Sequence, residues 1–154
     1  MEQPPGDRQL AAWRELLTAH ALVVEQIDRE LAAAAVVPLT WYDVLVELHQ
    51  ALDGRLRMNE LADAVLLSRS GLSRLVDRLE RAGLLGREAC PDDGRGAFAV
   101  ITVAGENALR EAWPVYARGI ARHVGRHLSD DEATAIAGSL ARISAAVRDP
   151  RQEP

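Results

Sequence analysis

One change of sequence period constrains the fold of this chain more than any other feature. Over most of the chain, apolar residues recur every three or four positions, which is the spacing of amphipathic helices. Between residues 84 and 102 this spacing gives way to two short strand-like runs, residues 84–89 and 97–102. The polar residues 91–96 between them have the composition of a hairpin tip. The sequence therefore predicts a mostly α-helical protein with one short β-hairpin.

The helical spacing predicts six helices, and capping or breaking residues indicate where they end. The expected ranges are about 7–34, 40–51, 60–66, 69–82, 102–128 and 130–148. The candidate caps are Thr40, Ser68 and Ser129 at N-termini and Gly83 at a C-terminus. Pro114 lies inside the fifth helix, where it must kink the helix or interrupt one backbone hydrogen bond. Two short helices joined by a tight turn and followed by a hairpin have the order of a winged helix-turn-helix.

The composition agrees with one compact domain around an aliphatic core. The chain has 154 residues, 48% of them hydrophobic, but only three Trp, two Tyr and one Phe. No apolar run approaches the roughly 20 residues of a membrane-spanning helix, and the first residues lack the basic and apolar segments of a signal peptide. The single cysteine, Cys90, cannot form an internal disulfide, which favours a reducing compartment. We therefore expect a cytoplasmic protein that makes no membrane contact.

The charge distribution is more informative than the net charge of −5. Every basic residue is an arginine, and residues 69–81 hold four of them against two acidic residues. Arginine can form two parallel hydrogen bonds with a phosphate or a guanine base, which lysine cannot do. A locally basic helix on an acidic protein is therefore compatible with DNA binding.

The stretch from Met58 to Leu85 resembles the DNA-binding core of the MarR family of transcriptional regulators. The hairpin segment from Pro91 to Arg95, followed by Ile101 to Gly105, matches the family's spacing from wing to helix, and the resemblance covers about residues 38–109. It departs from the family at Gly94, where a second basic wing residue is common. The resemblance implies a winged helix-turn-helix core at 38–105 between dimerisation helices at 1–37 and 106–154.

This resemblance also implies a function. A homodimer would bind a pseudo-palindrome in double-stranded DNA and act as a ligand-responsive repressor. The first, fifth and sixth helices carry apolar stripes that a monomer of this size cannot cover. The positions expected to be buried between two copies include Leu10, Trp13, Ile120 and Ile143. A helical dimer that acts through a protein partner remains an alternative.

The candidate DNA-binding residues belong to the fourth helix and to the hairpin tip. They are Ser68, Arg69, Ser70, Ser73, Arg74, Arg78, Arg81, Asp93 and Arg95. Ser70, Ser73 and Arg74 lie near the start of the helix, from where side chains reach base edges. Arg78 and Arg81 suit phosphates, and Arg95 suits a narrow minor groove. Asp77 is expected to orient Arg74, Arg81 or Arg95; a merely solvated arginine face is the alternative reading.

The effector is less defined than the DNA-binding helix. Four residues could line a pocket for an aromatic or phenolic ligand, although they could also be plain core: Trp13, Trp41, Tyr42 and His49. His123 and His127 have the four-residue helical spacing that can share a metal, but packed histidines are the alternative. Cys90 could sense oxidants or be an inert strand residue.

Enzyme activity is not expected. The sequence has no nucleophile-elbow serine with a matching Asp and His, no glycine-rich phosphate loop and no Cys-x-x-Cys pair. No cofactor is implied.

Overall fold

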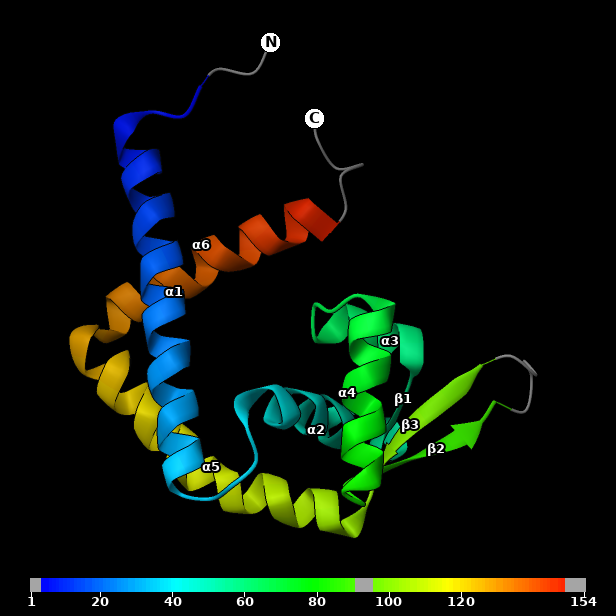
Figure 1. The fold of residues 1–154 in the computed structure, drawn as a ribbon. Helices are drawn as coiled ribbons and strands as arrows, with labels where there is room; N and C mark the ends of the chain where they lie inside the picture. Colours follow the sequence, from blue (N-terminus) through cyan, green and yellow to red (C-terminus); the bar gives the residue numbers. More distant parts are fainter. Residues whose placement is uncertain (1–3, 91–95, 149–154) are drawn as a thin grey trace. The chain divides into compact units, whose positions relative to one another are not determined.

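The computed structural model describes residues 4–90 and 96–148, and these are mostly helical, as predicted (Figure 1). The helices are α1 (Asp7–Ala33), α2 (Leu39–Gln50), α3 (Met58–Ala64), α4 (Arg69–Arg81), α5 (Val103–His123) and α6 (Asp130–Arg148). Two short 3₁₀ turns, η1 (Leu52–Gly54) and η2 (Gly125–His127), follow α2 and α5. The chain forms two compact units, residues 1–117 and 118–154, so α5 begins in the first unit and ends in the second.

Three strands in the first unit form an antiparallel sheet in the order β1-β3-β2. β2 (Leu85–Ala89) and β3 (Ala97–Ile101) are the predicted hairpin, with Leu85 opposite Ile101. β1 (Arg55–Arg57) pairs with the other edge of β3, with Arg55 opposite Val100. The sequence did not predict β1, because three residues are too few to show an alternating pattern. This strand extends the hairpin into a sheet that packs against α2, α3 and α4.

The core of the first unit is aliphatic. On α4 the predicted stripe of Leu72, Leu75, Val76 and Leu79 is buried, and Leu72 and Leu79 are fully so. Leu45 of α2 and Leu61 of α3 are also fully buried in this core. Each such side chain contributes roughly 1.5–3 kcal/mol relative to an exposed position. The core therefore fixes which face of α4 points outward.

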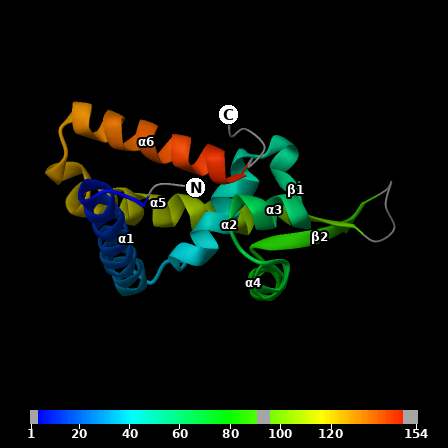
Figure 2. The same ribbon diagram turned by 90° about the horizontal axis from the view of Figure 1, so that it is seen from above.

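Both ends of α4 are held by the residues that the sequence predicted. At its N-terminus the Oγ of Ser68 accepts a hydrogen bond from the Gly71 N–H at 3.1 Å. At its C-terminus Gly83 has a φ of 75°, and its N–H donates to the Glu80 carbonyl at 2.9 Å. The Leu84 N–H donates to the Leu79 carbonyl at 3.0 Å, which completes a Schellman motif. This motif turns the chain directly from α4 into β2, and Figure 2 shows α4 nearly end-on beside β2.

Thr40 is not the N-cap of α2, contrary to expectation. The helix begins earlier, at Leu39, with Pro38 in the cap position. The backbone N–H of Leu39 is instead satisfied by the Asp28 side chain of α1, whose Oδ1 accepts its hydrogen bond at 3.0 Å. A tertiary contact thus replaces the local cap, because a free helix N-terminus needs an acceptor from somewhere.

The fifth helix ends at His123 and not near Leu128 as predicted. Val124 has a non-helical backbone, with φ −125° and ψ −62°, and Gly125 then begins η2. Glycine disfavours continuation of a helix because it has the most backbone freedom to lose. Pro114 lies within α5, which continues on both sides of it.

The N-terminus of α6 is a capping box, as predicted. The Ser129 N–H donates to Glu132 Oε2 at 2.8 Å, and the Glu132 N–H donates to Ser129 Oγ at 3.3 Å. The hydrogen bonds from the backbone and side chain of Ser129 lower the pKa of the Glu132 carboxyl.

No helix within residues 4–90 or 96–148 is long and apolar enough to cross a membrane.

Candidate DNA-binding surface

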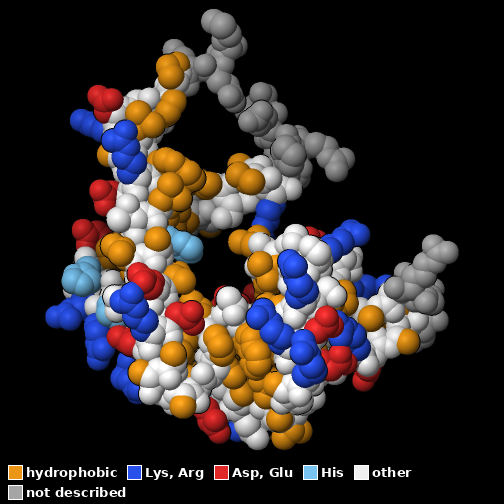
Figure 3. Space-filling model, viewed as in Figure 1, with side chains coloured by type: hydrophobic (Ala, Val, Ile, Leu, Met, Phe, Trp, Pro, Cys, Tyr) orange, Lys and Arg blue, Asp and Glu red, His pale blue; other side chains and the backbone are white. Residues whose placement is uncertain are grey.

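The outward face of α4 is polar and basic. Ser70, Arg74, Arg78 and Arg81 are exposed on it, and Ser73 is half-buried at its edge. In Figure 3, arginine side chains gather over α4 and the adjoining strands, with acidic side chains between them. Because Leu72 and Leu79 anchor the opposite face in the core, this face cannot rotate away from solvent.

Three arginines of α4 carry charge that no carboxylate of the described residues neutralises. Arg69, Arg74 and Arg78 form no ion pair with any residue that the structure describes. The Nε of Arg81 donates a hydrogen bond to the backbone carbonyl of Asp77 at 3.1 Å, which leaves its terminal nitrogens exposed. Such guanidinium groups are available to phosphates or base edges.

The first turn of α4 brings together Ser68, Arg69 and Ser70. The Ser68 hydroxyl is engaged as the helix cap, and its Oγ lies 3.4 Å from the Oγ of Ser70. All three residues are exposed. Ser68 therefore shapes the surface by capping α4, and one hydroxyl of the Ser68–Ser70 pair donates to the other.

Arg87 of β2 binds the two acidic residues of α4. Its guanidinium donates to Asp77 Oδ1 at 2.6 Å and also to Glu80 Oε2. Although partial burial disfavours the charged form, hydrogen bonds to Asp77 and Glu80 raise the pKa of Arg87 above its usual value. The predicted partners of Asp77 on α4 were therefore wrong: its ion-pair partner among the described residues is Arg87. The pairing offsets one of the two negative charges of these carboxylates and joins α4 to the wing sheet.

Sequence reasoning missed this role of Arg87 because the pair spans ten residues and depends on how the hairpin returns along α4. An arginine facing two carboxylates across a predicted helix–strand turn was the available signal.

The hairpin stem is closed below its tip by the backbone of Cys90, whose N–H donates to the Gly96 carbonyl at 3.1 Å. The predicted wing residues Asp93 and Arg95 lie outside the described residues. Cys90 itself is a buried free thiol.

A model of the MarR family matches residues 37–96. The Streptomyces coelicolor regulator Sco3205, solved in complex with DNA, is 33% identical; the match covers 99% of this chain and 95% of that chain, with a TM-score of 0.86. AbsC, a MarR family regulator from the same organism, is 31% identical over 96% of this chain and 99% of that chain, with a TM-score of 0.85. This chain belongs to the MarR family.

A third relative is matched over a shorter region. YkoM, an HTH-type transcriptional regulator of Bacillus subtilis, is 34% identical over 79 residues, so the match spans 51% of each protein. As a member of the MarR family, the chain is a DNA-binding transcriptional regulator and not an enzyme, as its sequence predicted.

Two of the residues expected to line an effector pocket of this MarR family protein lie apart within one chain. Trp13 is exposed on α1, whereas Trp41 of α2 packs against the core. At about 1.5 Å per residue, Trp13 lies roughly 20 Å along α1 from Ile27, the first residue of α1 that is buried. One protomer therefore does not bring Trp13 beside the α2 residues.

The other two expected pocket residues, Tyr42 and His49, contact α5. Tyr42 is buried, and its ring centroid lies 4.7 Å from that of Tyr116. The Trp113 ring centroid lies 6.3 Å from that of Tyr116, so three aromatic rings cluster between α2 and α5. His49 is exposed, and its Nδ1 lies 2.8 Å from Glu106 Oε2. Sequence reasoning did not single out Trp113 or Tyr116 as neighbours of Tyr42.

The helical spacing assumed for His123 and His127 is wrong. α5 ends at His123, and His127 belongs to η2. Across the described parts of the chain, no three His, Cys, Asp or Glu residues are grouped so that they could hold a metal ion.

Proposed function

We propose that this MarR family regulator is a homodimeric repressor that binds a pseudo-palindromic operator through two copies of α4. The observation that carries the proposal is the outward face of α4, where Arg69, Arg74 and Arg78 are exposed and unpaired among the described residues. An α-helix of 13 residues is about 20 Å long and fits the major groove of B-DNA.

The proposed contacts follow the position of each residue along α4. Ser70, Ser73 and Arg74 read base edges from the first half of the helix, whereas Arg78 and Arg81 contact phosphates. At the start of α4, Ser68 and Arg69 donate hydrogen bonds to the sugar-phosphate backbone of the DNA. Asp93 and Arg95 at the hairpin tip belong to the wing, and Arg95 enters the adjacent minor groove.

Exposed apolar side chains on both units support dimerisation. On α1, Trp13 is 57% exposed and Leu17 is 50% exposed; on α6, Ile143 is 56% exposed. No described residue of α6 is buried, although the helix is amphipathic. A two-fold dimer would cover these stripes with a second copy and would place two α4 helices on one operator. Leu10 and Ile120 are proposed members of the same interface.

The test compares two exposed arginines by gel shift with DNA upstream of the protein's own gene. Arg74→Ala should weaken binding by about 1–3 kcal/mol in each of the two half-sites, the value of a good bidentate base contact, and should relax base preference. Arg29→Ala is the matched control, because Arg29 is exposed on α1 and pairs with Glu25. Equal affinity and equal base preference for Arg74→Ala and the unmodified protein would contradict the assignment.

Response to an aromatic anion is a second part of the proposal. It is supported by the rings of Tyr42, Trp113 and Tyr116 at the junction of α2 and α5, with Trp113 half-exposed. A ligand bound there would change operator affinity only if it favoured one separation of the two α4 helices. Trp41 and His49 flank this junction on α2, and Trp13 could join it only in an assembly of two copies.

Gel-shift titrations with phenolic acids, zinc and peroxide in parallel test this second part. Release by a phenolic acid that is weakened by Trp113→Ala supports it. Release by zinc alone, abolished in His127→Ala, or by peroxide alone, abolished in Cys90→Ser, would contradict it. A repressor acts where the chromosomal DNA lies, which supports a cytoplasmic location.

A further inference from the structure

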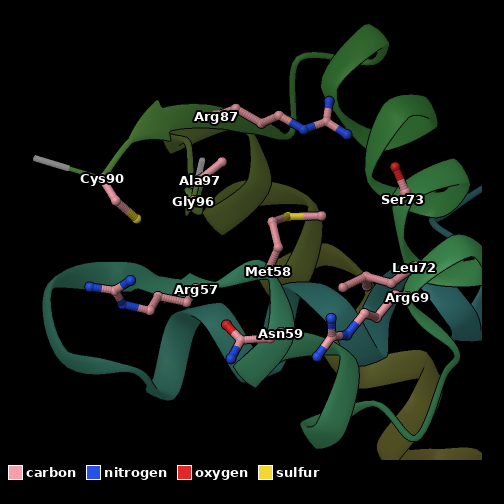
Figure 4. Close-up of a pocket in the computed structure, with 10 residues that line it drawn as sticks. All are labelled: Arg57, Met58, Asn59, Arg69, Leu72, Ser73, Arg87, Cys90, Gly96 and Ala97. Carbon is pink, nitrogen blue, oxygen red and sulfur yellow. The ribbon is translucent and has the colours of Figure 1, made fainter. Parts of the chain in front are cut away.

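A cavity of about 510 Å³ lies between α4 and the wing sheet (Figure 4). Residues from α3, from the first half of α4, from strands β1, β2 and β3 and from the stem of the hairpin line it. Three of its ten lining residues are arginines, Arg57, Arg69 and Arg87, and none is acidic. The cavity is therefore basic, although its walls also include Met58 and Leu72.

Two of these three arginines form no ion pair with a described carboxylate. Arg87 extends toward α4, as Figure 4 shows, where Asp77 and Glu80 neutralise it. Arg69 starts α4 and forms no ion pair with a described residue. Arg57 ends β1 and likewise has no carboxylate partner within residues 4–90 and 96–148.

The guanidinium of Arg57 contacts an aromatic ring and forms no ion pair with a carboxylate in residues 4–90 or 96–148. Its Cζ lies 5.3 Å from the centroid of the Phe98 ring on β3, the distance of a cation–π contact. In Figure 4, Arg57 and Cys90 lie on the wing side of the cavity, and Arg69, beside Leu72 of α4, lies on the opposite side. Two available positive charges therefore stand at opposite ends of one basic cavity.

The position of the cavity indicates what would cross it. Arg69 and Ser73 belong to the α4 face that carries the proposed major-groove contacts, and Cys90 and Gly96 belong to the stem of the wing. Adjacent major and minor grooves are separated by one sugar-phosphate backbone. A duplex with α4 in the major groove and the wing in the next minor groove must therefore lay that backbone across the cavity.

We propose that this cavity cradles backbone phosphates of the bound duplex, with Arg57 as a phosphate contact outside both the recognition helix and the wing tip. The inference rests on the proposed function, since it needs α4 and the wing to engage one duplex. It assigns a DNA contact to β1, the strand that sequence reasoning did not detect.

Arg55 provides a matched control for Arg57. Both are arginines of β1, and the Cζ of Arg55 lies 4.8 Å from the same Phe98 ring centroid. Arg55 differs because its Nη1 lies 3.5 Å from Glu88 Oε2 and because it does not line the cavity. Loss of either arginine removes one positive charge and one cation–π contact. Only Arg57 lines the cavity that we propose for the DNA backbone.

The experiment measures operator affinity by fluorescence anisotropy over a series of salt concentrations, with the full chain. Arg57→Ala removes one charge-assisted contact from each of the two protomers. It should therefore weaken binding of the dimer about a hundredfold, tenfold for each contact, and should lower the log–log salt slope by about 1.8 in total. Arg57→Lys should retain the slope, because a point charge still meets a phosphate. Arg55→Ala should leave the affinity within about twofold of the unmodified protein and the salt slope unchanged, and thermal melting checks that each variant is folded.

An unchanged salt slope in Arg57→Ala would overturn the inference. An equal loss of slope in Arg55→Ala would also overturn it, because any positive charge of the sheet would then attract DNA equally well. The proposed function fails separately. If Arg74→Ala weakens binding and Arg57→Ala does not, only the cradle is wrong. If the unmodified protein binds no duplex, the proposed function itself is contradicted.

Discussion

Apolar residues recur at helical spacing both in α4 of the winged-helix region and in α6, but they differ in how far they are buried. In α4 the whole stripe is covered by the chain itself, and Leu72 is fully buried. In α6 the corresponding residues, Ile136 and Ile143, remain about half-exposed, and no described residue of the helix is buried. Periodicity thus predicts that a helix face is covered, but it does not say whether the same chain or a second copy covers it.

The same contrast separates two kinds of function. A helix that is packed on one side by its own chain presents a fixed opposite face, which suits the reading of DNA. A helix that still has apolar area to bury suits assembly. The stability of the first should depend on single side chains of the core, and that of the second on protein concentration.

The largest expected effect comes from trimming one apolar residue in each region. Leu72→Ala should lower the free energy of unfolding by about 2–5 kcal/mol, because it leaves a cavity in the core. Ile143→Ala should change unfolding of the dilute protein by less than about 0.5 kcal/mol but should weaken self-association. Urea unfolding and sedimentation equilibrium measure the two. A loss in Ile143→Ala as large as that in Leu72→Ala, with self-association unchanged, would show that α6 is covered within its own chain.

Substitution by alanine should change the stability of the protein in opposite directions at two glycines. A Cβ at Gly105 would lie 2.1 Å from the Leu84 carbonyl oxygen, so Gly105→Ala must displace the start of α5 from the chain that follows α4. Overpacking of this kind costs about 1–3 kcal/mol. In α6 the nearest atom to a Cβ at Gly138 is 3.8 Å away, and Gly138→Ala should stabilise by about 0.5–1 kcal/mol through helix propensity. Thermal denaturation checks both signs, and a stabilising Gly105→Ala would contradict the close approach.

The smallest effects concern the two serine caps. Ser68→Ala should lower stability by about 1 kcal/mol and should also weaken operator binding, because the cap positions the first turn of α4. Ser129→Ala should fray α6 without changing the unfolding of the winged-helix core. Circular dichroism during thermal melting measures both losses. Equal stability of Ser68→Ala and the unmodified protein would contradict the capping role.

The Ser129 cap should also depend on pH in a defined direction. Hydrogen bonds from Ser129 lower the pKa of Glu132 below its ordinary value of 4.5. A lowered pKa in the folded state stabilises above the ordinary value, and the contribution is lost as the pH falls through the lowered one. The difference in melting between Ser129→Ala and the unmodified protein should therefore shrink in acid. A difference that grows as the pH falls would be the opposite result.

Local signals made most of the fold predictable. Ser68 and Gly83 bracket α4 with chemistry that depends only on nearby residues, and both caps are present. The hairpin strands were also predicted within a residue at each end. One failure was local, since α5 ends before Gly125 and not near Leu128. The others were tertiary. Leu39 takes its cap from Asp28 of another helix, and β1 exists because β3 offers it a free edge.

The DNA-binding residues of α4 could be predicted from the sequence, but the contacts of α4 with the neighbouring strands could not. The arginines of α4 follow from periodicity, since the positions opposite the apolar stripe must face outward. The pairing of Arg87 with Asp77 and Glu80, and the placement of Arg57 beside the cavity, depend on how the sheet returns along α4. The sequence offered Asp77 two partners on its own helix and Arg95 of the hairpin tip, and it did not weigh Arg87 of the intervening strand, which folding brings close.

The central claim is that two copies of α4 read one duplex, and selection of bound sequences from a random duplex pool tests it most directly. The account predicts an inverted repeat whose half-site centres lie about 10 bp apart, the spacing of one helical turn. The same selection with Arg74→Ala should lose base preference within each half-site and keep the spacing. Enrichment of a single, non-repeated motif, or no enrichment at all, would contradict the claim.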